Sequence, residues 1–567
     1  MSDTTIFDPI AYINEPRWRS SRLGLERMRE LLARLDNPQD KLRFVHVAGT
    51  NGKGSTCAYL ASILQAAGYK CGLFTSPYIE TFEERIRIDG KNISASDLLN
   101  VTLDVRTSSE QMADHPTEFE LMCAVALLYF ARQSCEIVVM EVGLGGRLDA
   151  TNVIDAPEVC VIARIGLDHT DLLGETLAEI AREKAGIIKR GVAVVSYPQA
   201  PEAAQVIEDV CAQNKCALSV PDFSRLEVFP VEKAGFYTIQ PTLTQPTLTQ
   251  PTLTQPTPVF SAAVLKHVSR ETFRPPVESV PYSEKITSDG GVVVLDSGED
   301  AFDNGGGTPV EGEVFPDKKE SAAQSPSLYR WFSYGEFRDL KTTLLGSYQP
   351  QNAALALEVV RVLQRKGWRI SKDAVYKGIA QTNWPGRFEV VAANPTFIVD
   401  GGHNPQGACA LAETLDDVLP GERVIFVMGV LADKDYASMI KTVLPYARAF
   451  ITFAPPNPRA LSAADLAQTI RSLVQEHIET REAAEGAEAA EDAEVTEPVE
   501  PAAPIESVVS VETTEAVEVA EGARELAIRE AASTAQAIKC AREMAGADDV
   551  IVAFGSLYSI AALKAAL

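Results

Sequence analysis

Short apolar runs alternate with helical patterns through the first part of the chain. Arg43–Val47 is a β-rich run that leads into a glycine-rich loop, and a helical pattern then covers Ser55–Ala67. Glu136–Val142 and Val159–Ile165 are two further apolar runs, and helical patterns lie between the runs. Short apolar runs separated in this way are typical of a parallel sheet with crossover helices. We therefore predict an α/β region built on a P-loop-type parallel sheet.

A second series of apolar runs occupies the last third of the chain. Each run leads into a turn rich in Gly, Pro or Asp, and the candidate strands are Thr396–Val399, Val424–Met428, Ala449–Phe453 and Val550–Phe554. This pattern is typical of an open, doubly wound, Rossmann-like sheet, which binds ligands beyond the carboxyl ends of its strands. Trp384-Pro385-Gly386 resembles a domain junction. We expect an ATP-binding domain at residues 1–384 and a second α/β domain at residues 385–567.

Two stretches interrupt this pattern. Pro241–Thr257 repeats TLTQP, and the Gly-, Ser- and acid-rich sequence that follows extends to Ser327. Such sequence has no apolar periodicity, so residues 240–327 are predicted to be a disordered insertion. Glu482–Glu521 carries thirteen Asp or Glu residues and no Lys or Arg. That composition favours a second disordered insertion, at about residues 480–523, and the alternative is an acidic interaction arm.

Size and charge narrow the classes of function. At 567 residues the chain exceeds the size at which one hydrophobic core stops growing, so at least two domains are expected. Its formal net charge is −26, which disfavours nucleic acid and anionic membranes as main partners. The nine cysteines form no CxxC pair, which fits free thiols in a reducing cytoplasm. MSDTTIFDPI at the N-terminus has no signal-peptide pattern, and the longest apolar run is too short to span a bilayer.

The strongest local signal of chemistry is VAGTNGKGS, Val47–Ser55, between the first strand and its helix. Glycines let backbone N–H groups converge on phosphate oxygens, Lys53 reaches the outer phosphates, and the Ser55 hydroxyl suits Mg²⁺. Gly54 separates the Lys from the Ser, so the spacing departs from the usual phosphate loop. A glycine-rich turn without a ligand is the alternative interpretation.

Three further positions carry candidate chemistry. Glu141 ends an apolar strand, where NTPases place a carboxylate that binds Mg²⁺, although a surface acid would give the same pattern. Asp168-His169 follows the next strand, and Lys184 lies in a helical pattern further on. A single His or Lys is more often a structural or solvated residue than a functional one. These positions indicate a function only when they are considered together.

In combination, the segments resemble the folylpolyglutamate synthase and dihydrofolate synthase family of the Mur ligase superfamily. The motifs occur in the family's order and cover most of the chain outside the two insertions: GTNGKGS, TSPY, TEFE, EVGLGGRLDATN, LDHTDLLG, REKAGI, NWPGRFEV, DGGHNP, DKD and GSLY. The family has His where Tyr348 stands and often Ala at Gly402, and neither departure removes a charge that the chemistry needs.

The resemblance implies a role for each matching residue. The ATP-binding residues would be Asn51, Gly52, Lys53, Gly54, Ser55, Asn352, Arg387 and Asp400. Two Mg²⁺ sites would use Ser55, Ser76, Glu141, His169 and Lys184, with Lys184 carbamylated, and K⁺ is a further expected cation. Catalysis would depend on Lys184, His169, Glu141 and His403, which lies near the glutamate. Pterin contacts would come from Ser21, Arg22, Leu23, Thr117, Glu118, Phe119, Glu120, Leu148, Asp149 and Ala150.

The resemblance also implies a reaction. A monomeric cytoplasmic ligase would use ATP to join L-glutamate to dihydropteroate, a reduced folate or both, through an acyl phosphate. One rival function is a Mur ligase that adds an amino acid to a UDP-linked cell-wall precursor. A second rival is a regulatory protein or non-catalytic homologue that binds nucleotide without turnover.

Overall fold

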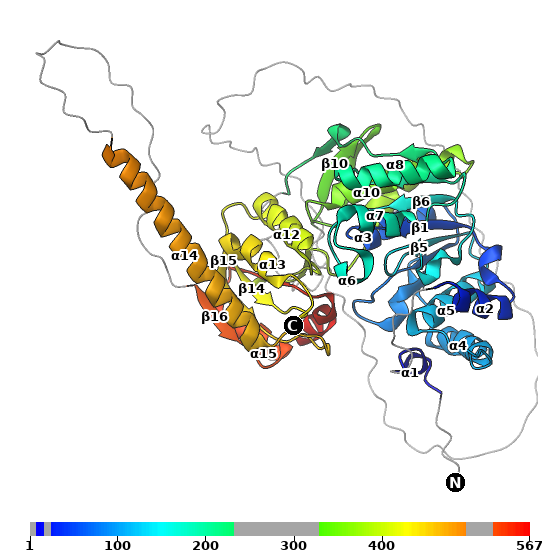
Figure 1. The fold of residues 1–567 in the computed structure, drawn as a ribbon, viewed down its shortest axis with the longest axis horizontal. Coiled ribbons are helices and arrows are strands. Elements are labelled where there is room, and N and C mark those ends of the chain that lie inside the picture. Colours follow the sequence, from blue (N-terminus) through cyan, green and yellow to red (C-terminus); the bar gives the residue numbers. More distant parts are fainter. Residues whose placement is uncertain (1–6, 16–23, 232–327, 495–525) are drawn as a thin grey trace, which may run out of the picture. The chain divides into compact units, whose positions relative to one another are not determined.

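The computed structural model describes residues 7–15, 24–231, 328–494 and 526–567, and side chains within residues 481–494 are left out of the description (Figure 1). These residues belong to one compact unit. The predicted insertion at residues 240–327 lies outside the described residues, as does the predicted pterin contact Ser21–Leu23.

The predicted first sheet is confirmed and has eight strands in the order β4-β3-β2-β5-β1-β6-β7-β8. β1, β2, β5, β6, β7 and β8 pair in parallel, and β3 and β4 extend one edge in antiparallel fashion. The strands are β1 Phe44–Ala48, β2 Cys71–Phe74, β3 Ile86–Ile88, β4 Lys91–Asn92, β5 Ile137–Glu141, β6 Val159–Ile162, β7 Ala193–Ser196 and β8 Leu218–Ser219.

Alternation of side chains along the central strands creates two packed layers. In β5, Ile137 and Val139 pack with the helices on one face, while Val138 and Met140 pack on the other. Every residue of β1 and β5 is buried, as expected for strands covered on both sides. One layer is formed by α3 Lys53–Ala66, α10 Gln349–Arg365 and α11 Lys372–Gln381, and the other by α2 Glu26–Arg34, α4 Ala95–Ser109 and α5 Glu118–Arg132.

The remaining elements of this region complete the sheet and carry one further small sheet. α7 Leu177–Ala185 and α8 Pro201–Asn214 cover β6 and β7. The short helices α1 Pro9–Ile13 and α6 Thr170–Leu173 pack on these layers, Ile13 against α4 and α5 and Leu173 against α7. A three-stranded antiparallel sheet contains β9 Leu226–Val228, β10 Arg330–Tyr334 and β11 Phe337–Thr342.

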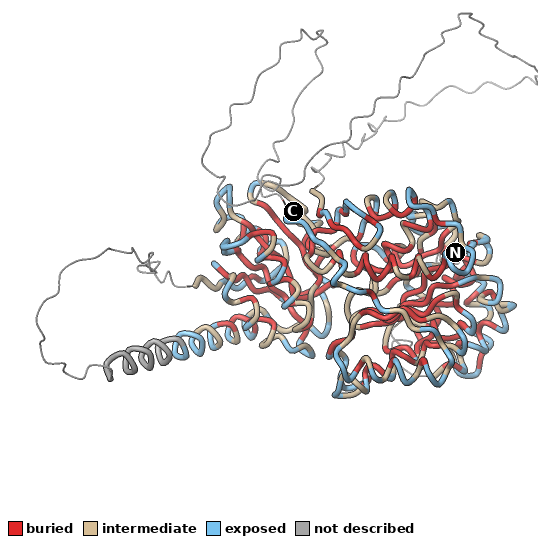
Figure 2. Tube along the Cα trace, turned by 90° about the horizontal axis from the view of Figure 1, so that it is seen from above, coloured by how far each residue is buried: buried red, intermediate tan, exposed pale blue. Residues whose placement is uncertain are grey.

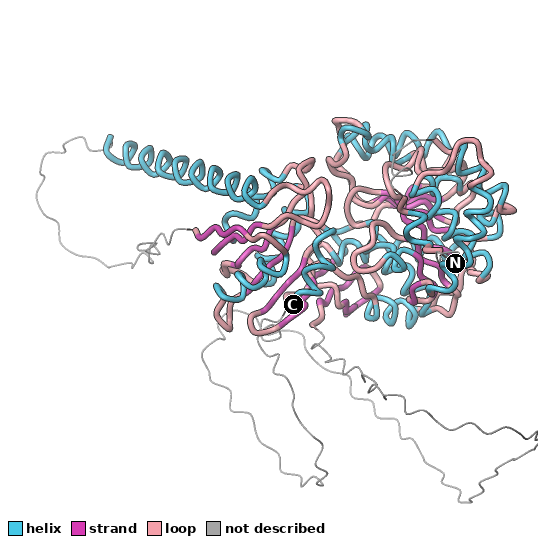
Figure 3. Tube along the Cα trace, turned by 90° about the horizontal axis from the view of Figure 1, so that it is seen from below, coloured by secondary structure: helices cyan, strands magenta, loops and turns pink. Residues whose placement is uncertain are grey.

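The predicted second sheet is also confirmed, with the strand order β12-β13-β17-β14-β15-β16. Only β12 is antiparallel to its neighbour. The strands are β12 Glu389–Ala392, β13 Thr396–Val399, β14 Val424–Met428, β15 Ala447–Thr452, β16 Ala527–Glu530 and β17 Val550–Phe554, and the helices are α12 Pro405–Val418, α13 Tyr436–Val443, α14 Ala463–Glu494, α15 Thr534–Met544 and α16 Ile560–Ala566. Figure 2 shows buried segments running through the interior and exposed segments at the surface, and Figure 3 shows helices running alongside the strands.

The first part of the acidic stretch is helical, although the whole stretch was predicted to be disordered. α14 continues to Glu494, so residues 482–494 are helical where a disordered spacer was expected. Ala and Glu are strong helix formers, which explains why a helix can extend into an acidic segment. Residues 495–521 of this stretch lie outside the described residues. Among the described helices, none has the length and apolar character needed to cross a membrane.

We predict that Gly378→Ala destabilises the fold. A Cβ at Gly378 of α11 would lie 2.4 Å from the Cα of Ile63 in α3, so the two helices would have to move apart. Overpacking of this kind costs about 1–3 kcal/mol. Thermal unfolding should show a melting temperature several degrees lower. Gly546→Ala is the matched control, since its Cβ would meet only a side-chain oxygen at 3.5 Å, and equal melting temperatures for both variants would contradict the packing argument.

Candidate active site

The phosphate-loop candidate connects β1 to α3, and its backbone requires glycine. Gly52 is the N-cap residue before the helix and has a φ of 84°. Gly49 has a φ of 151°, and a Cβ there would lie 2.7 Å from the Cβ of Ala163. Residues 49–55 line a cavity of about 230 Å³. The helix starts at Lys53, two residues before the predicted start, so the first-turn N–H groups face the loop.

Glu141 reaches the same cavity from the end of β5. Its carboxylate is almost fully buried, accepts a hydrogen bond from the backbone N–H of Ser76 at 3.2 Å, and lies 3.9 Å from the Lys53 ammonium. Burial raises the pKa of Glu141, while the charge of Lys53 opposes the rise. A buried carboxylate with one cation at this distance retains oxygen lone pairs for a further positive ligand.

Lys184 presents a buried amine beside the loop. A capping box between Thr176 and Glu179 fixes the start of α7, which carries Lys184 in its last turn. The side chain is 4% exposed, and Nζ donates a hydrogen bond to the Gly49 carbonyl at 2.9 Å. Burial, together with the nearby charge of Lys53, lowers the pKa of Lys184 to about 7. The amine is therefore partly neutral near physiological pH, unlike a solvated lysine.

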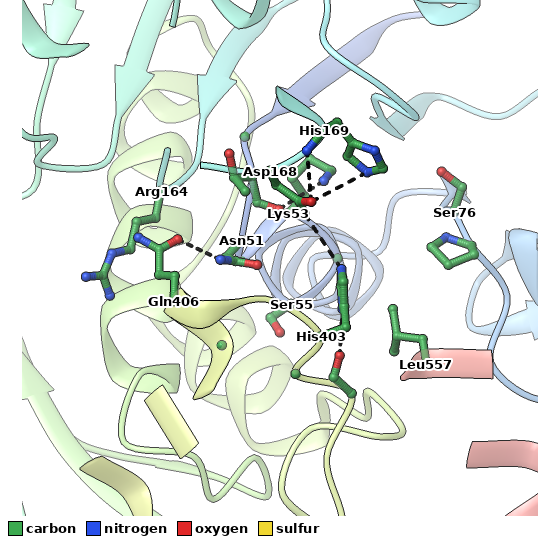
Figure 4. A pocket seen from close by; sticks show the side chains of 18 of the residues that line it. Asn51, Lys53, Ser55, Ser76, Arg164, Asp168, His169, His403, Gln406 and Leu557 are labelled. Carbon is green, nitrogen blue, oxygen red and sulfur yellow. Dashed lines mark hydrogen bonds and ion pairs between the residues drawn. The ribbon is translucent and has the colours of Figure 1, made fainter. Parts of the chain in front are cut away.

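His169 lies at the rim of the cavity, as Figure 4 shows. It starts α6 in the left-handed region with a φ of 51°, an unusual conformation for a residue other than glycine. Burial lowers the pKa of His169, and the neighbouring Asp168 carboxylate opposes this change. A neutral imidazole is the form that binds a metal ion.

Asp400 and His403 enter from the loop after β13. Asp400 is buried and accepts hydrogen bonds from the N–H groups of Gly402 and Phe388 at 2.8 and 2.9 Å. Burial raises its pKa, and the charge of Arg387 opposes the rise. The Nδ1 of His403 donates to the Gly401 carbonyl at 2.8 Å, so Nε2 carries the free lone pair. Burial lowers the pKa of His403 to about 4.

Side-chain amides connect the remaining predicted ATP residues. Gln349 donates from Nε2 to the Ser55 hydroxyl at 3.2 Å, and its Oε1 accepts a hydrogen bond from Asn352 at 3.2 Å. Asn51 donates to Gln406 at 2.6 Å, a contact drawn in Figure 4. The side-chain amide of Asn51 thus joins the phosphate loop to the start of α12.

The structure brings the predicted ATP, metal and catalytic residues together. All of the following line the cavity: Asn51, Gly52, Lys53, Gly54, Ser55, Ser76, Glu141, His169, Lys184, Asn352, Arg387, Asp400 and His403. Among the described residues, no group of three or more His, Cys, Asp or Glu side chains is arranged so that it could hold a metal ion.

The described members of the predicted pterin set do not line this cavity, and several have structural contacts. Thr117 and Glu120 form the capping box of α5, and Glu120 also pairs with Arg27 at 3.1 Å. The Asp149 carboxylate accepts hydrogen bonds from Leu144 and Thr151. The pterin assignment of these residues stays a prediction; the members outside the cavity lining are Thr117, Glu118, Phe119, Glu120, Leu148, Asp149 and Ala150.

Several lining residues received no role from the sequence. Arg164, Gln406 and Lys434 reach the cavity, and Gln349 contacts Ser55 from outside the lining. Lys434 was visible only as the centre of the DKD motif, and Gln406 only as the residue after HNP. Their contacts join segments that lie hundreds of positions apart, so no local spacing indicates them.

Comparison with known proteins gives consistent matches. The Mur ligase middle domain matches residues 47–214, and the Mur ligase glutamate ligase domain matches residues 386–498. Dihydrofolate synthase/folylpolyglutamate synthase of Bacillus subtilis is 34% identical over 468 residues, 80% of this chain and 88% of that protein. Folylpolyglutamate synthase of Mycobacterium tuberculosis, complexed with ADP and AMPPCP, aligns with a TM-score of 0.66 at 24% identity and covers 98% of both chains. A folylpolyglutamate synthase–AMPPCP complex aligns with a TM-score of 0.63 at 25% identity, over 98% of both chains.

We predict that Lys184 makes the free energy of unfolding rise as the pH increases above 7. Its native pKa of about 7 lies below the ordinary value of 10.5. Between these values the unfolded chain binds a proton that the native chain does not, so stability rises with pH by up to about 1.4 kcal/mol per unit. Below pH 7 Lys184 is protonated in both the native and the unfolded chain, so it no longer makes the free energy of unfolding depend on pH.

Denaturant unfolding at pH 7–10 in CO₂-depleted buffer tests this expectation. The unfolding free energy of the wild type should rise relative to that of Lys184→Met as the pH increases. Parallel pH profiles for the two proteins would contradict the lowered pKa.

Proposed function

The chain belongs to the dihydrofolate synthase/folylpolyglutamate synthase family of Mur ligases, and on this premise we propose that it uses ATP to join L-glutamate to dihydropteroate, to reduced folates or to both. The observation that carries the proposal is the convergence of Lys53, Glu141, His169 and Lys184 on one cavity with Asp400 and His403 of the second sheet. Those residue types suit phosphoryl transfer, which depends mainly on positioning and charge neutralisation.

We assign the ATP contacts by the geometry of the cavity. The N–H groups at the start of α3 and the ammonium of Lys53 suit the phosphates. The Arg387 guanidinium is a further phosphate contact from the second region, and the buried Asp400 carboxylate is an acceptor for a sugar hydroxyl. Residues 1–384 would form the ATP-binding domain and residues 385–567 the ligase domain.

Mg²⁺ fits the oxygen groups present. The Glu141 carboxylate is buried with only Lys53 as a nearby ammonium, and the Ser55 hydroxyl accepts one hydrogen bond from Gln349, which leaves further oxygen lone pairs. We propose Ser55, Glu141 and Ser76 as residues that hold one Mg²⁺, and His169 with carbamylated Lys184 as residues that hold a second. Bound Mg²⁺ would polarise the γ-phosphate and screen its repulsion of an anionic nucleophile. K⁺ remains a proposed further cation.

The environment of Lys184 suits carbamylation. A lysine reacts with CO₂ only as the neutral amine, and the products are a carbamate anion and a proton. Burial that lowers the pKa to about 7 supplies this neutral form. The conversion also replaces repulsion between the ammonium groups of Lys184 and Lys53 with attraction between opposite charges.

The proposed reaction has two steps. The substrate carboxylate attacks the γ-phosphorus, the bond to the β-phosphate oxygen breaks, and an acyl phosphate and ADP form. The neutral amine of L-glutamate then attacks the acyl carbon, phosphate leaves, and the amine proton passes to solvent or to a base such as the free Nε2 of His403. Lys53 and Arg387 orient the phosphates, and exclusion of water from the cavity would protect the acyl phosphate from hydrolysis.

We also propose that the enzyme is a monomer and that it acts in the cytoplasm on small molecules. All nine cysteines are free in the structure, and burial raises the pKa of the Cys57 and Cys123 thiols, so these groups are poorly reactive.

We predict that ATP turnover depends on two co-substrates. ADP release should require both L-glutamate and a pteroate or folate acceptor, because the acyl phosphate forms on the acceptor and is consumed by the amine. Offering dihydropteroate and tetrahydrofolate separately, with amide formation followed by mass spectrometry, identifies the acceptor. Turnover with a UDP-linked cell-wall precursor would favour the rival Mur ligase, and nucleotide binding without turnover would favour a non-catalytic homologue.

We predict that Lys184→Ala reduces ligation by at least about a hundredfold, since one ligand of the charge-stabilising cluster is lost. Small carboxylates added to the assay should restore part of the rate by replacing the carbamate. Lys377→Ala, at an exposed position of α11, is the control and should keep full activity. Full ligation by Lys184→Ala without added carboxylates would show that the carbamate has no role.

A further inference from the structure

An ion pair joins the two α/β regions beside the cavity. Asp168 follows β6 of the first sheet, and Lys434 follows β14 of the second. Lys434 Nζ lies 2.6 Å from Asp168 Oδ1, and the two side chains are 9% and 10% exposed. Figure 4 shows the Asp168 carboxylate between His169 and His403.

The second carboxylate oxygen of Asp168 also faces the second region. Asn404 donates to Asp168 Oδ2 at 3.2 Å, and His403 Nε2 lies 3.9 Å from the same oxygen. Asn404 caps the start of α12 through the N–H of Gly407. One carboxylate thus contacts the two loops of the second region that reach the cavity.

A second set of contacts lies next to this pair. Asn51 of the phosphate loop donates to Gln406 at 2.6 Å, and Asn404 donates to the Asn51 side-chain oxygen at 3.3 Å. The first set attaches the loop after β6 to the start of α12 through Asn404 and to the loop before α13 through Lys434, and the second set attaches the phosphate loop to the start of α12. The two regions therefore meet through directional polar contacts at the cavity rim.

The burial of the ion pair gives it more influence than the exposed pairs on the surface. An exposed pair such as Lys441–Glu476, with side chains 55% and 59% exposed, is screened by water and contributes little. When one member of a buried pair is removed, the other charge remains without compensation in a poorly solvated position. The arrangement in which the two regions meet thus depends on both charges.

We propose that Asp168 and Lys434 are positioning residues that hold the second-region loops, one of which carries His403, against the phosphate loop, so that the cavity stays closed while the acyl phosphate exists. This inference rests on the proposed ligase function. It concerns how tightly ATP use is coupled to amide formation. An opened cavity would admit water, which would hydrolyse the acyl phosphate to phosphate and free acid before the amine attacks.

The test uses the full-length enzyme and three variants: Asp168→Asn, Lys434→Met and the double variant. Lys441→Met is the matched control, since this lysine belongs to the exposed pair on α13 and α14. The measurements are kcat, KM for ATP and glutamate, melting temperature, and the ratio of phosphate released to amide formed. The last ratio separates positioning from a purely structural role, because lost stability alone does not divert an intermediate to water.

The proposal predicts a fall in kcat of about tenfold or more for each single variant, with a phosphate-to-amide ratio that rises above the wild-type value. The double variant should lose no more than the worse single variant, because both substitutions remove the same interaction. The Lys441→Met control should match the wild type in kcat and in the phosphate-to-amide ratio. If a single variant fails to fold, the double variant, which carries no uncompensated charge, provides the same comparison.

Two results would overturn the inference: a phosphate-to-amide ratio unchanged in every folded variant, or losses in the two single variants that simply add in the double variant. A wild-type enzyme that does not ligate glutamate would instead refute the proposed function. The two failures are therefore distinguishable in one experiment.

Discussion

The burial of the Lys184 amine next to the Lys53 ammonium is the constraint on which the rest of the site depends. The Lys184 amine and the Lys53 ammonium share a cavity that the Glu141, Asp168 and Asp400 carboxylates also line, and the charge of Lys53 adds to burial in lowering the pKa of Lys184. The unfavourable charge is relieved when the amine loses its proton, when it becomes an anionic carbamate, or when a polyanion binds. A bound triphosphate would relieve the repulsion by neutralising positive charge, and carbamylation would relieve it by replacing one cation with an anion.

The fold places these groups with parallel strands. β1, β5 and β6 run side by side, so the phosphate loop, Glu141 and Asp168 emerge at one edge of the sheet. β13, β14 and β17 do the same in the second sheet and deliver Asp400, Lys434 and the Ser556 loop. Ligand sites at the carboxyl ends of parallel strands are expected for such sheets. The reaction then requires the two edges to meet, which makes polar contacts between them functional as well as structural.

The sequence predicted the central strands and the motif residues well, because strands covered on both faces are continuous apolar runs and phosphate loops have local spacing. It did not indicate β2–β4, β7–β12 or β16, most of which are short or lie toward the edges of their sheets. Asp168 was noticed, but its partner Lys434 lies far along the chain and no local pattern joins them. The contribution of Thr117 and Glu120 to the α5 cap was present in the sequence as T-x-x-E, a helix-start pattern that competes with the pterin interpretation.

The central claim is that this cavity activates a carboxylate by phosphoryl transfer, and oxygen labelling tests it directly. A pteroate or folate acceptor labelled with ¹⁸O in the reacting carboxylate is incubated with ATP, Mg²⁺ and L-glutamate, and the released phosphate is analysed by mass spectrometry. The account predicts transfer of one carboxylate oxygen to phosphate for each amide formed. Amide formation accompanied by unlabelled phosphate would contradict it.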